Sequence, residues 1–178
     1  MAVKEKIKEK EYEDEHFIDD DEDESSKENK FLTFRIADEI YGIDISDITE
    51  IIEMQKITDV PDMPNFVKGV INLRGKVIPI MDLRLRFNME EREYDDRTCV
   101  IIVNINVSTI GFIVDTVLEV VDISEENIDP PPQFKTASGY ERYVSGIGKL
   151  GNDVKILLDA DKIVHREELE KITQNVEK

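Results

Sequence analysis

Arg74 is the residue whose place in the sequence most clearly suggests a chemical role. Residues 67–83 return in degraded form at residues 144–160, with Gly151 standing where the first copy has Arg74. A side chain needed only for folding would be expected in both copies, so Arg74 is the first candidate for function. A guanidinium group presented by a rigid turn can bind a carboxylate through its planar fork of donors.

Glu50 is the carboxylate that we expect Arg74 to meet. It lies at the end of an isoleucine-rich segment, and its counterpart in the second repeat is Glu119. Because Arg74 has no counterpart, such an ion pair would exist in one half of the chain only. The alternative is a plain hairpin, in which the turn Asn72-Leu73-Arg74-Gly75 carries a solvated arginine.

Signals for an enzyme are poor. His16 lies in an acidic stretch and His165 in a predicted C-terminal helix, and neither has a serine or cysteine partner that suggests a nucleophilic pair. The segment Gly146-Ile147-Gly148-Lys149 lacks the spacing of a phosphate-binding loop, so a tight turn is the better interpretation. Cysteine and histidine spacing typical of metal ligands is absent, and we expect neither a metal nor a cofactor.

Charge is distributed unevenly along the 178 residues. The net charge is −18, and residues 1–30 contain thirteen acidic residues and six lysines. A stretch of this kind buries little apolar surface, so we expect residues 1–30 to form a disordered, solubilising tail, with an autoinhibitory acidic arm as the alternative. The acidity argues against nucleic acid as a partner, because phosphate binding needs clustered lysine and arginine.

The sequence predicts a cytoplasmic protein. Its N-terminus lacks the apolar core of a signal peptide, and no apolar run approaches the roughly 20 residues that span a bilayer. The single cysteine, Cys99, cannot form an internal disulfide and is interpreted as a small core residue.

Strand patterns dominate after the tail. Residues 31–36 and 40–45 predict a hairpin, because short apolar and aromatic runs flank a turn at residues 37–39. From Ser46 the period changes, and Ile45, Ile48, Ile51 and Ile52 fall on one helical face. Their β-branched side chains leave a strand open as the alternative. The isoleucines themselves are interpreted either as core or as a surface for an apolar partner.

The second half of the chain repeats the first. Residues 100–105 and 111–114 match residues 31–36 and 42–45 at a constant offset, and the strands predicted at 67–73 and 76–83 recur beyond residue 143. Each half therefore offers about five short strands, a pattern typical of a small barrel, which removes exposed sheet edges. A terminal helix is predicted for residues 159–172, with Asp159 as its cap.

Several segments resemble the CheW family of chemotaxis coupling proteins, over about residues 31–170. The matching segments are residues 41–45 (YGIDI), 50–51 (EI), 57–61 (ITDVP), 66–75 (FVKGVINLRG), Pro79, 82–84 (DLR) and 111–115 (GFIVD). The resemblance implies a mainly all-β fold of two pseudo-symmetric, five-stranded SH3-like barrels side by side. The first barrel would occupy residues 31–88 and the second residues 98–158, with strand exchange between them left open.

The resemblance also implies a function without catalysis. Members of the family join the regulatory domain of the histidine kinase CheA to the cytoplasmic tips of chemoreceptors, without entering the membrane themselves. By the same resemblance, receptor helices would contact Leu32, Ile45, Ile48, Ile51, Ile110 and Gly111 between the barrels. Glu50 and Arg74 would be polar coupling positions beside them, and the motif turn would comprise Gly69, Asn72 and Gly75. The alternatives are a coupler of a non-flagellar signalling system and an enzyme with a carboxylate site between the barrels.

Overall fold

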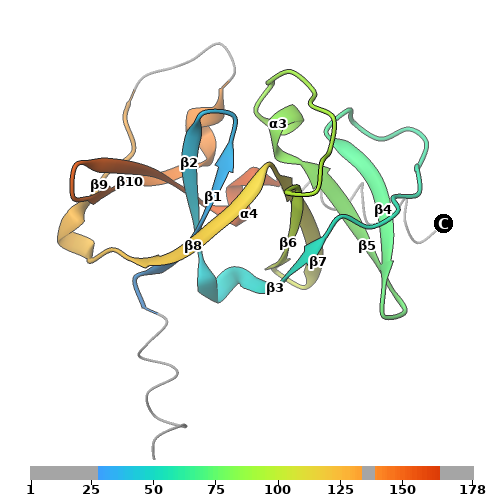
Figure 1. Ribbon diagram of the computed structural model, residues 1–178, viewed down its shortest axis with the longest axis horizontal. Helices are drawn as coiled ribbons and strands as arrows, with labels where there is room; N and C mark the ends of the chain where they lie inside the picture. Colours follow the sequence, from blue (N-terminus) through green and yellow to red (C-terminus); the bar gives the residue numbers. More distant parts are fainter. Residues whose placement is uncertain (1–27, 134–138, 165–178) are drawn as a thin grey trace, which may run out of the picture.

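Two antiparallel-rich sheets lie side by side in the computed structural model, which describes residues 28–133 and 139–164 (Figure 1). The six-stranded sheet has the order β8 (Thr116–Asp122), β1 (Lys30–Ile36), β2 (Glu39–Asp44), β11 (Asp153–Leu158), β10 (Val144–Leu150) and β9 (Ile128–Asp129). The five-stranded sheet has the order β3 (Ile48–Glu53), β6 (Cys99–Ile105), β7 (Ser108–Val114), β5 (Lys76–Asp82) and β4 (Val67–Leu73). The predicted all-β fold with few helices is confirmed.

Each sheet combines strands from both sequence repeats. β1 and β2 pair with β8 and β11, while β6 and β7 pair with β3 and β5. The β2–β11 and β5–β7 pairs are the parallel ones, and they join the two halves of the chain within each sheet. The strand exchange that the sequence left open is therefore present, and neither residues 31–88 nor residues 98–158 form a barrel by themselves. The first two strands of one repeat share a sheet with the last two strands of the other: β1 and β2 with β10 and β11, and β6 and β7 with β4 and β5.

The segment after β2 is a strand, so the strand alternative is correct and the helix is wrong. Only one 3-10 turn, η1 (Ile45–Asp47), precedes β3. Its cap is Asp44, whose carboxylate accepts a hydrogen bond from the Ser46 backbone N–H at 2.9 Å. β-Branched side chains favour a pleated, half-buried surface, which explains the outcome.

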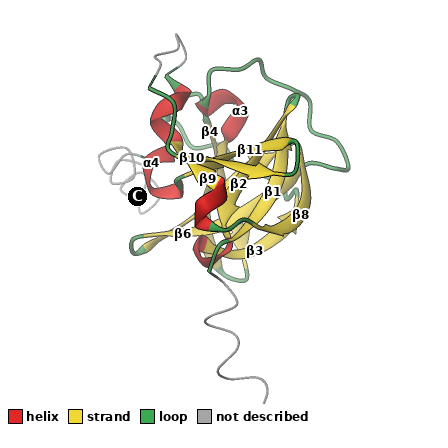
Figure 2. Ribbon diagram, turned by 90° about the vertical axis from the view of Figure 1, so that its left-hand side faces the viewer, coloured by secondary structure: helices red, strands yellow, loops and turns green. Residues whose placement is uncertain are grey.

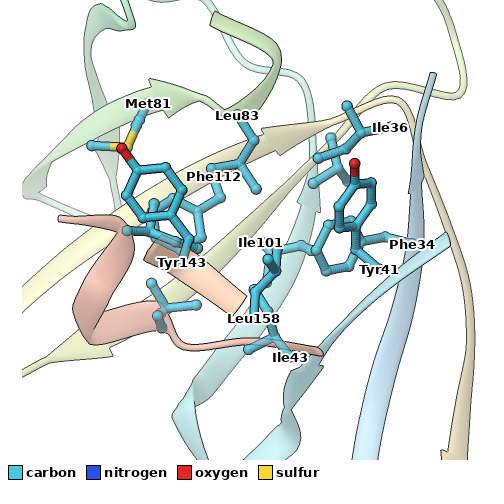
Figure 3. Close-up of a cluster of buried hydrophobic side chains, with 14 of the residues drawn as sticks. Phe34, Ile36, Tyr41, Ile43, Met81, Leu83, Ile101, Phe112, Tyr143 and Leu158 are labelled. Atoms are coloured by element: carbon cyan, nitrogen blue, oxygen red, sulfur yellow. The ribbon is translucent and has the colours of Figure 1, made fainter. Parts of the chain in front are cut away.

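The largest hydrophobic cluster fills the space between the two sheets. Figure 3 shows Phe34 and Tyr41 of the six-stranded sheet together with Ile101 and Phe112 of the five-stranded sheet. On the opposite face of each sheet, inside the curl of its own barrel, lies a smaller cluster. The cluster of the five-stranded sheet includes Ile71, Ile78, Ile80, Val100, Ile102 and Ile113. That of the six-stranded sheet includes Val121, Ile123 and Leu157. Successive strand residues therefore alternate between a barrel interior and the shared core.

Two short helices lie on the same side of the molecule, α3 (Leu83–Arg86) and α4 (Ala160–Ile163) (Figure 2). The Arg86 Nε–H donates to the carbonyl of Ile163 at 2.8 Å, and its guanidinium lies 4.4 Å from the ring centre of Phe66 and 5.0 Å from that of Tyr143. Phe66 leads into β4 and Tyr143 into β10. Arg86 therefore joins the two sheets through contacts to both.

Parts of the predicted ends lie outside the described residues. Asp159 caps α4 as predicted, accepting a hydrogen bond from the Asp161 N–H at 3.0 Å, but the predicted extension beyond residue 164 is not described. The predicted tail is described only from residue 28. Within it, Lys30 already belongs to β1, and the carbonyl of Asn29 accepts a hydrogen bond from Ile123. In the described ranges, no helix has the length and apolar character needed to cross a bilayer.

Candidate functional site

Arg74 stands in a two-residue turn between β4 and β5. Leu73 pairs with Lys76, and both turn residues have positive φ, 51° for Arg74 and 87° for Gly75. Two positive φ values suit the twist of a tight hairpin, but a non-glycine residue in this region is strained. The Asn72 side chain offsets part of this cost, because its Oδ1 accepts a hydrogen bond from the Gly75 N–H at 2.9 Å.

The repeat shows what the turn itself requires at this position. Gly151 occupies the place of Arg74 in the β10–β11 turn and also has a positive φ, 62°. Glycine adopts such a conformation without a steric cost. An arginine in the same conformation therefore costs stability for the turn, and strain of this kind is a reason to look for function.

The predicted contact between Arg74 and Glu50 is confirmed. Arg74 Nη1 donates to Glu50 Oε2 at 2.8 Å, with the Arg74 side chain 73% exposed and that of Glu50 26% exposed. This hydrogen bond lowers the pKa of Glu50 and raises the pKa of Arg74. The bond is single, so the guanidinium does not engage the carboxylate through its full fork.

The pair also closes the five-stranded sheet. Glu50 lies on β3 and Arg74 follows β4, and these two strands are the edges of that sheet. A backbone bridge between Thr58 and Val70 joins the same two sides, with N–O distances of 2.8 and 2.9 Å. Paired or covered edges do not recruit other strands, so both contacts protect this end of the barrel.

A β-bulge places Ile48 and Ile51 on one face of β3. Ile48 lies opposite Val103 and Ile51 opposite Ile101, with a register shift between Ile48 and Glu50. Residues directly opposite each other on paired strands point to the same face of the sheet. Without a bulge, residues three apart in a strand would point to opposite faces, but the extra residue of the bulge brings Ile51 back to the face of Ile48. Ile48 packs against the core between the sheets, whereas Ile51 is 43% exposed.

The repeat-equivalent strand β8 presents a similar face. Val117 packs against the same core and lies opposite Phe34, while Val120 lies opposite Leu32 and is 53% exposed. Ile48 and Ile51 with Val117 and Val120 thus form what we call the apolar edge faces of β3 and β8. In each strand, one side chain reaches the core and the next one on that face reaches solvent.

Three positions that the resemblance assigned to receptor contact are buried. Leu32 and Ile110 are 4% and 1% exposed, respectively, within the core between the sheets. Gly111 faces the interior of the five-stranded sheet, where an added Cβ would lie 2.6 Å from Ile80 Cδ1 and 2.7 Å from Val100 Cγ1. These three residues lie beneath the surface, and Ile45 is half-buried.

Sequence reasoning assigned no role to Asp115, whose carboxylate joins residues that are far apart in the sequence. Its carboxylate accepts hydrogen bonds from Arg84 Nε at 2.7 Å, Arg84 Nη2 at 2.6 Å and the Ala37 N–H at 2.8 Å. Burial alone would raise the pKa of Asp115, but these donors outweigh burial and lower it. Arg84 and Asp115 both lie in segments that carry the family resemblance, but the resemblance did not indicate that the two side chains pair.

Nothing in the described ranges groups three or more histidine, cysteine, aspartate or glutamate side chains in a way that could hold a metal ion. Cys99 is half-buried at the start of β6. Among the polar contacts of the described residues, the ion pair at the barrel end and the carboxylate–arginine contact at Asp115 join parts of the chain that are distant in sequence.

Comparison with known proteins agrees with this architecture. The CheW-like domain profile matches residues 30–168. The chain is 39% identical over 140 residues to the chemotaxis protein CheW of Klebsiella aerogenes, covering 79% of this chain and 84% of that protein. It is 34% identical over 147 residues to CheW of Treponema pallidum, covering 80% and 86%. The crystal structure of the scaffolding protein TtCheW from Thermoanaerobacter tengcongensis superposes with a TM-score of 0.72 at 37% identity, covering 79% of this chain and 94% of that one. This chain therefore belongs to the CheW-like domain family.

Proposed function

We propose that this protein is a cytoplasmic, non-catalytic adaptor that couples the cytoplasmic tips of chemoreceptors to the histidine kinase CheA. The observation that carries the proposal is the family match across residues 30–168, which takes in both sheets. A solved relative at 37% identity is described as a scaffolding protein. An adaptor of this kind changes the activity of one partner according to the state of another, and needs binding surfaces rather than reacting groups.

The receptor-binding surface in this proposal is the apolar edge face of β3, with Ile45 and Ile48 at its base and Ile51 at its exposed end. An amphipathic receptor helix can bury its apolar stripe against such a surface. Leu32, Ile110 and Gly111 contribute from beneath, by holding the strands in place. This division between supporting and contacting residues supports a rigid, preformed site.

Ile51→Asp should weaken binding of a receptor-tip hairpin by about tenfold or more, because the bound state would bury an unpaired carboxylate. Ile51 is 43% exposed, so the free protein should keep its fold. Titration of the variant with a receptor-tip fragment, with circular dichroism to check folding, measures the effect. Val154→Asp is the matched control, because Val154 is 55% exposed in the β10–β11 hairpin. Equal affinities for the two variants would exclude this face.

Arg74 is the second element of the proposal, as a polar coupling position beside the receptor surface. The positive φ of Arg74 costs the turn free energy, and the second repeat has Gly151 at the equivalent position. In this proposal the guanidinium, held by one bond to Glu50, offers its remaining donors to a partner protein.

Arg74→Gly should reduce receptor-dependent kinase activation about tenfold while changing the free energy of unfolding by less than about 1 kcal/mol. The variant loses an exposed ion pair but gains a residue suited to positive φ, so the two effects on stability oppose each other. A reconstituted receptor–kinase assay and denaturant unfolding of the same preparation measure both. Arg97→Ala, which removes an exposed arginine elsewhere, should behave like the wild type. Normal activation by Arg74→Gly would contradict the role given to Arg74.

A further inference from the structure

A cavity of about 290 Å³ opens at the end of the five-stranded sheet where Arg74 and Glu50 meet. Its apolar lining comes from Leu73, Ile78 and Ile102, and its charged lining from Glu50, Arg74 and Lys76. The size suits an amino-acid side chain. The cavity therefore combines an aliphatic wall with charged groups, as small-molecule and side-chain sites usually do.

One atom of this lining lacks a partner. Glu50 Oε2 accepts the bond from Arg74, but Glu50 Oε1 is buried and has no hydrogen bond, alone among the buried side-chain polar atoms of the described residues. A buried acceptor that has no hydrogen-bond donor lowers the stability of the folded state, and such unpaired acceptors are rare in native proteins. The oxygen is thus placed to accept a hydrogen bond from a group that enters the cavity.

The charges of the lining restrict what that group can be. An incoming ammonium or guanidinium group would be attracted by Glu50 but repelled by both Arg74 and Lys76, the two cations of the lining. An incoming carboxylate would be attracted by them but would offer Glu50 Oε1 no donor. A carboxamide is neutral and carries both a donor and an acceptor.

We propose that this cavity binds a glutamine or asparagine side chain of a partner protein. The amide N–H donates to Glu50 Oε1, the amide oxygen accepts from Arg74 or Lys76, and the methylene groups lie against Ile78 and Ile102. Only the identity of the protein that carries the amide rests on the adaptor function proposed above.

The six-stranded sheet does not reproduce the site. The positions equivalent to Ile78 and Ile102 are Lys155 and Thr33, both buried, and Gly151 replaces Arg74. Neither the apolar wall nor the cation is therefore a consequence of the repeated fold. The cavity is a feature of the five-stranded sheet, as the Arg74–Glu50 pair is.

The test is a titration of the full chain, labelled with ¹⁵N, with four capped amino acids: N-acetyl glutamine, glutamate, lysine and methionine N-methylamides. We expect saturable shifts of the Gly75, Asn104 and Thr109 amide signals with the glutamine probe, at a dissociation constant about tenfold or more below those of the other three. The methionine probe has a side chain of similar length without the carboxamide and carries the same two capping amides, so it measures the contribution of the apolar wall and of the caps.

Two variants locate the binding on the protein. Glu50→Ala should abolish the preference for glutamine, whereas Glu119→Ala, its repeat counterpart, should keep it. Absence of saturable shifts, equal affinity for all four probes, or an unchanged preference in Glu50→Ala would each overturn the inference. If the protein does not bind the glutamine probe but still activates the kinase, this inference is wrong and the proposed adaptor function is unaffected.

Discussion

Replacement of Gly69 by alanine is expected to lower the free energy of unfolding by more than about 3 kcal/mol. Gly69 has a φ of 142°, and an added Cβ would lie 2.1 Å from the Thr58 carbonyl oxygen and 2.8 Å from its carbon. The obstacle is backbone, which cannot rotate away as a side chain can. It is also the backbone of the Thr58–Val70 bridge, so relief of the clash would break the contact that closes the five-stranded sheet.

Gly75→Ala is the control for Gly69→Ala, because both glycines have positive φ. The sequence placed both in one motif turn, but Gly69 and Asn72 lie within β4, Gly69 at its register shift, and only Gly75 belongs to the turn. An added Cβ at Gly75 meets nothing within 4 Å. Only the backbone strain remains, so we expect a loss of about 1–2 kcal/mol. Denaturant unfolding of the two variants separates clash from strain. Losses of similar size would show that Thr58 moves away easily, which would contradict the tight closure described here.

Local features of the fold were predictable from the sequence. Alternating apolar residues and turn chemistry define hairpins through contacts between near neighbours, as at β4–β5, where Leu73 and Lys76 flank Arg74-Gly75. The Arg74–Glu50 pair followed from comparison of the repeats. An arginine present in one copy only, beside a carboxylate present in both, is a pattern that folding alone does not explain.

The partners of the strands were not predictable in the same way. The two repeats share their apolar pattern, so β1 satisfies the pairing preferences of β8 as well as those of β3. Long-range contacts make the choice, namely the parallel β2–β11 and β5–β7 pairs and the core between the sheets. A sequence pattern of period two contains no information on which sheet a strand joins.

Depth beneath the surface was also hidden from the sequence. A family resemblance marks Leu32 and Ile110 as part of the receptor site, but it does not show whether such a residue touches the partner or lies in the core beneath the residues that do. The bulge that restores Ile51 to the face of Ile48 adds a second difficulty. It gives two strand residues the spacing of a helical face, which explains why the segment resembled a helix.

Replacement of Asp115 by alanine is expected to cost about 3 kcal/mol of unfolding free energy, because its carboxylate accepts hydrogen bonds from Arg84, Arg92 and Ala37, which lie in different parts of the fold. Ala37 lies in the β1–β2 turn of the six-stranded sheet, and Arg84 lies in α3 after β5 of the five-stranded sheet. The Arg84 side chain is 16% exposed. Without Asp115 it would keep its charge in a poorly hydrated place.

The effect of Asp115 should depend on pH in a defined direction. Its pKa is lower in the folded protein than in the unfolded chain, where it is about 3.9, so its stabilising contribution is present above that value and is lost as the pH falls through the folded pKa. The difference in unfolding free energy between the wild type and Asp115→Asn should therefore be constant near neutral pH and shrink below about pH 4.

Denaturant unfolding of the wild type, Asp115→Ala, Asp115→Asn and Asp129→Ala across this pH range tests the prediction. Asp129 forms an exposed ion pair with Lys149 at 3.2 Å, so its removal should cost only about 0–1 kcal/mol. If Asp115→Ala were no more costly than Asp129→Ala, the contact would be an ordinary surface ion pair. If the expected loss is found, the contacts of Asp115 hold the two sheets together, because Ala37 and Arg84 follow strands of different sheets. The apolar edge faces of β3 and β8 belong to different sheets, so their relative placement would then depend on this buried carboxylate.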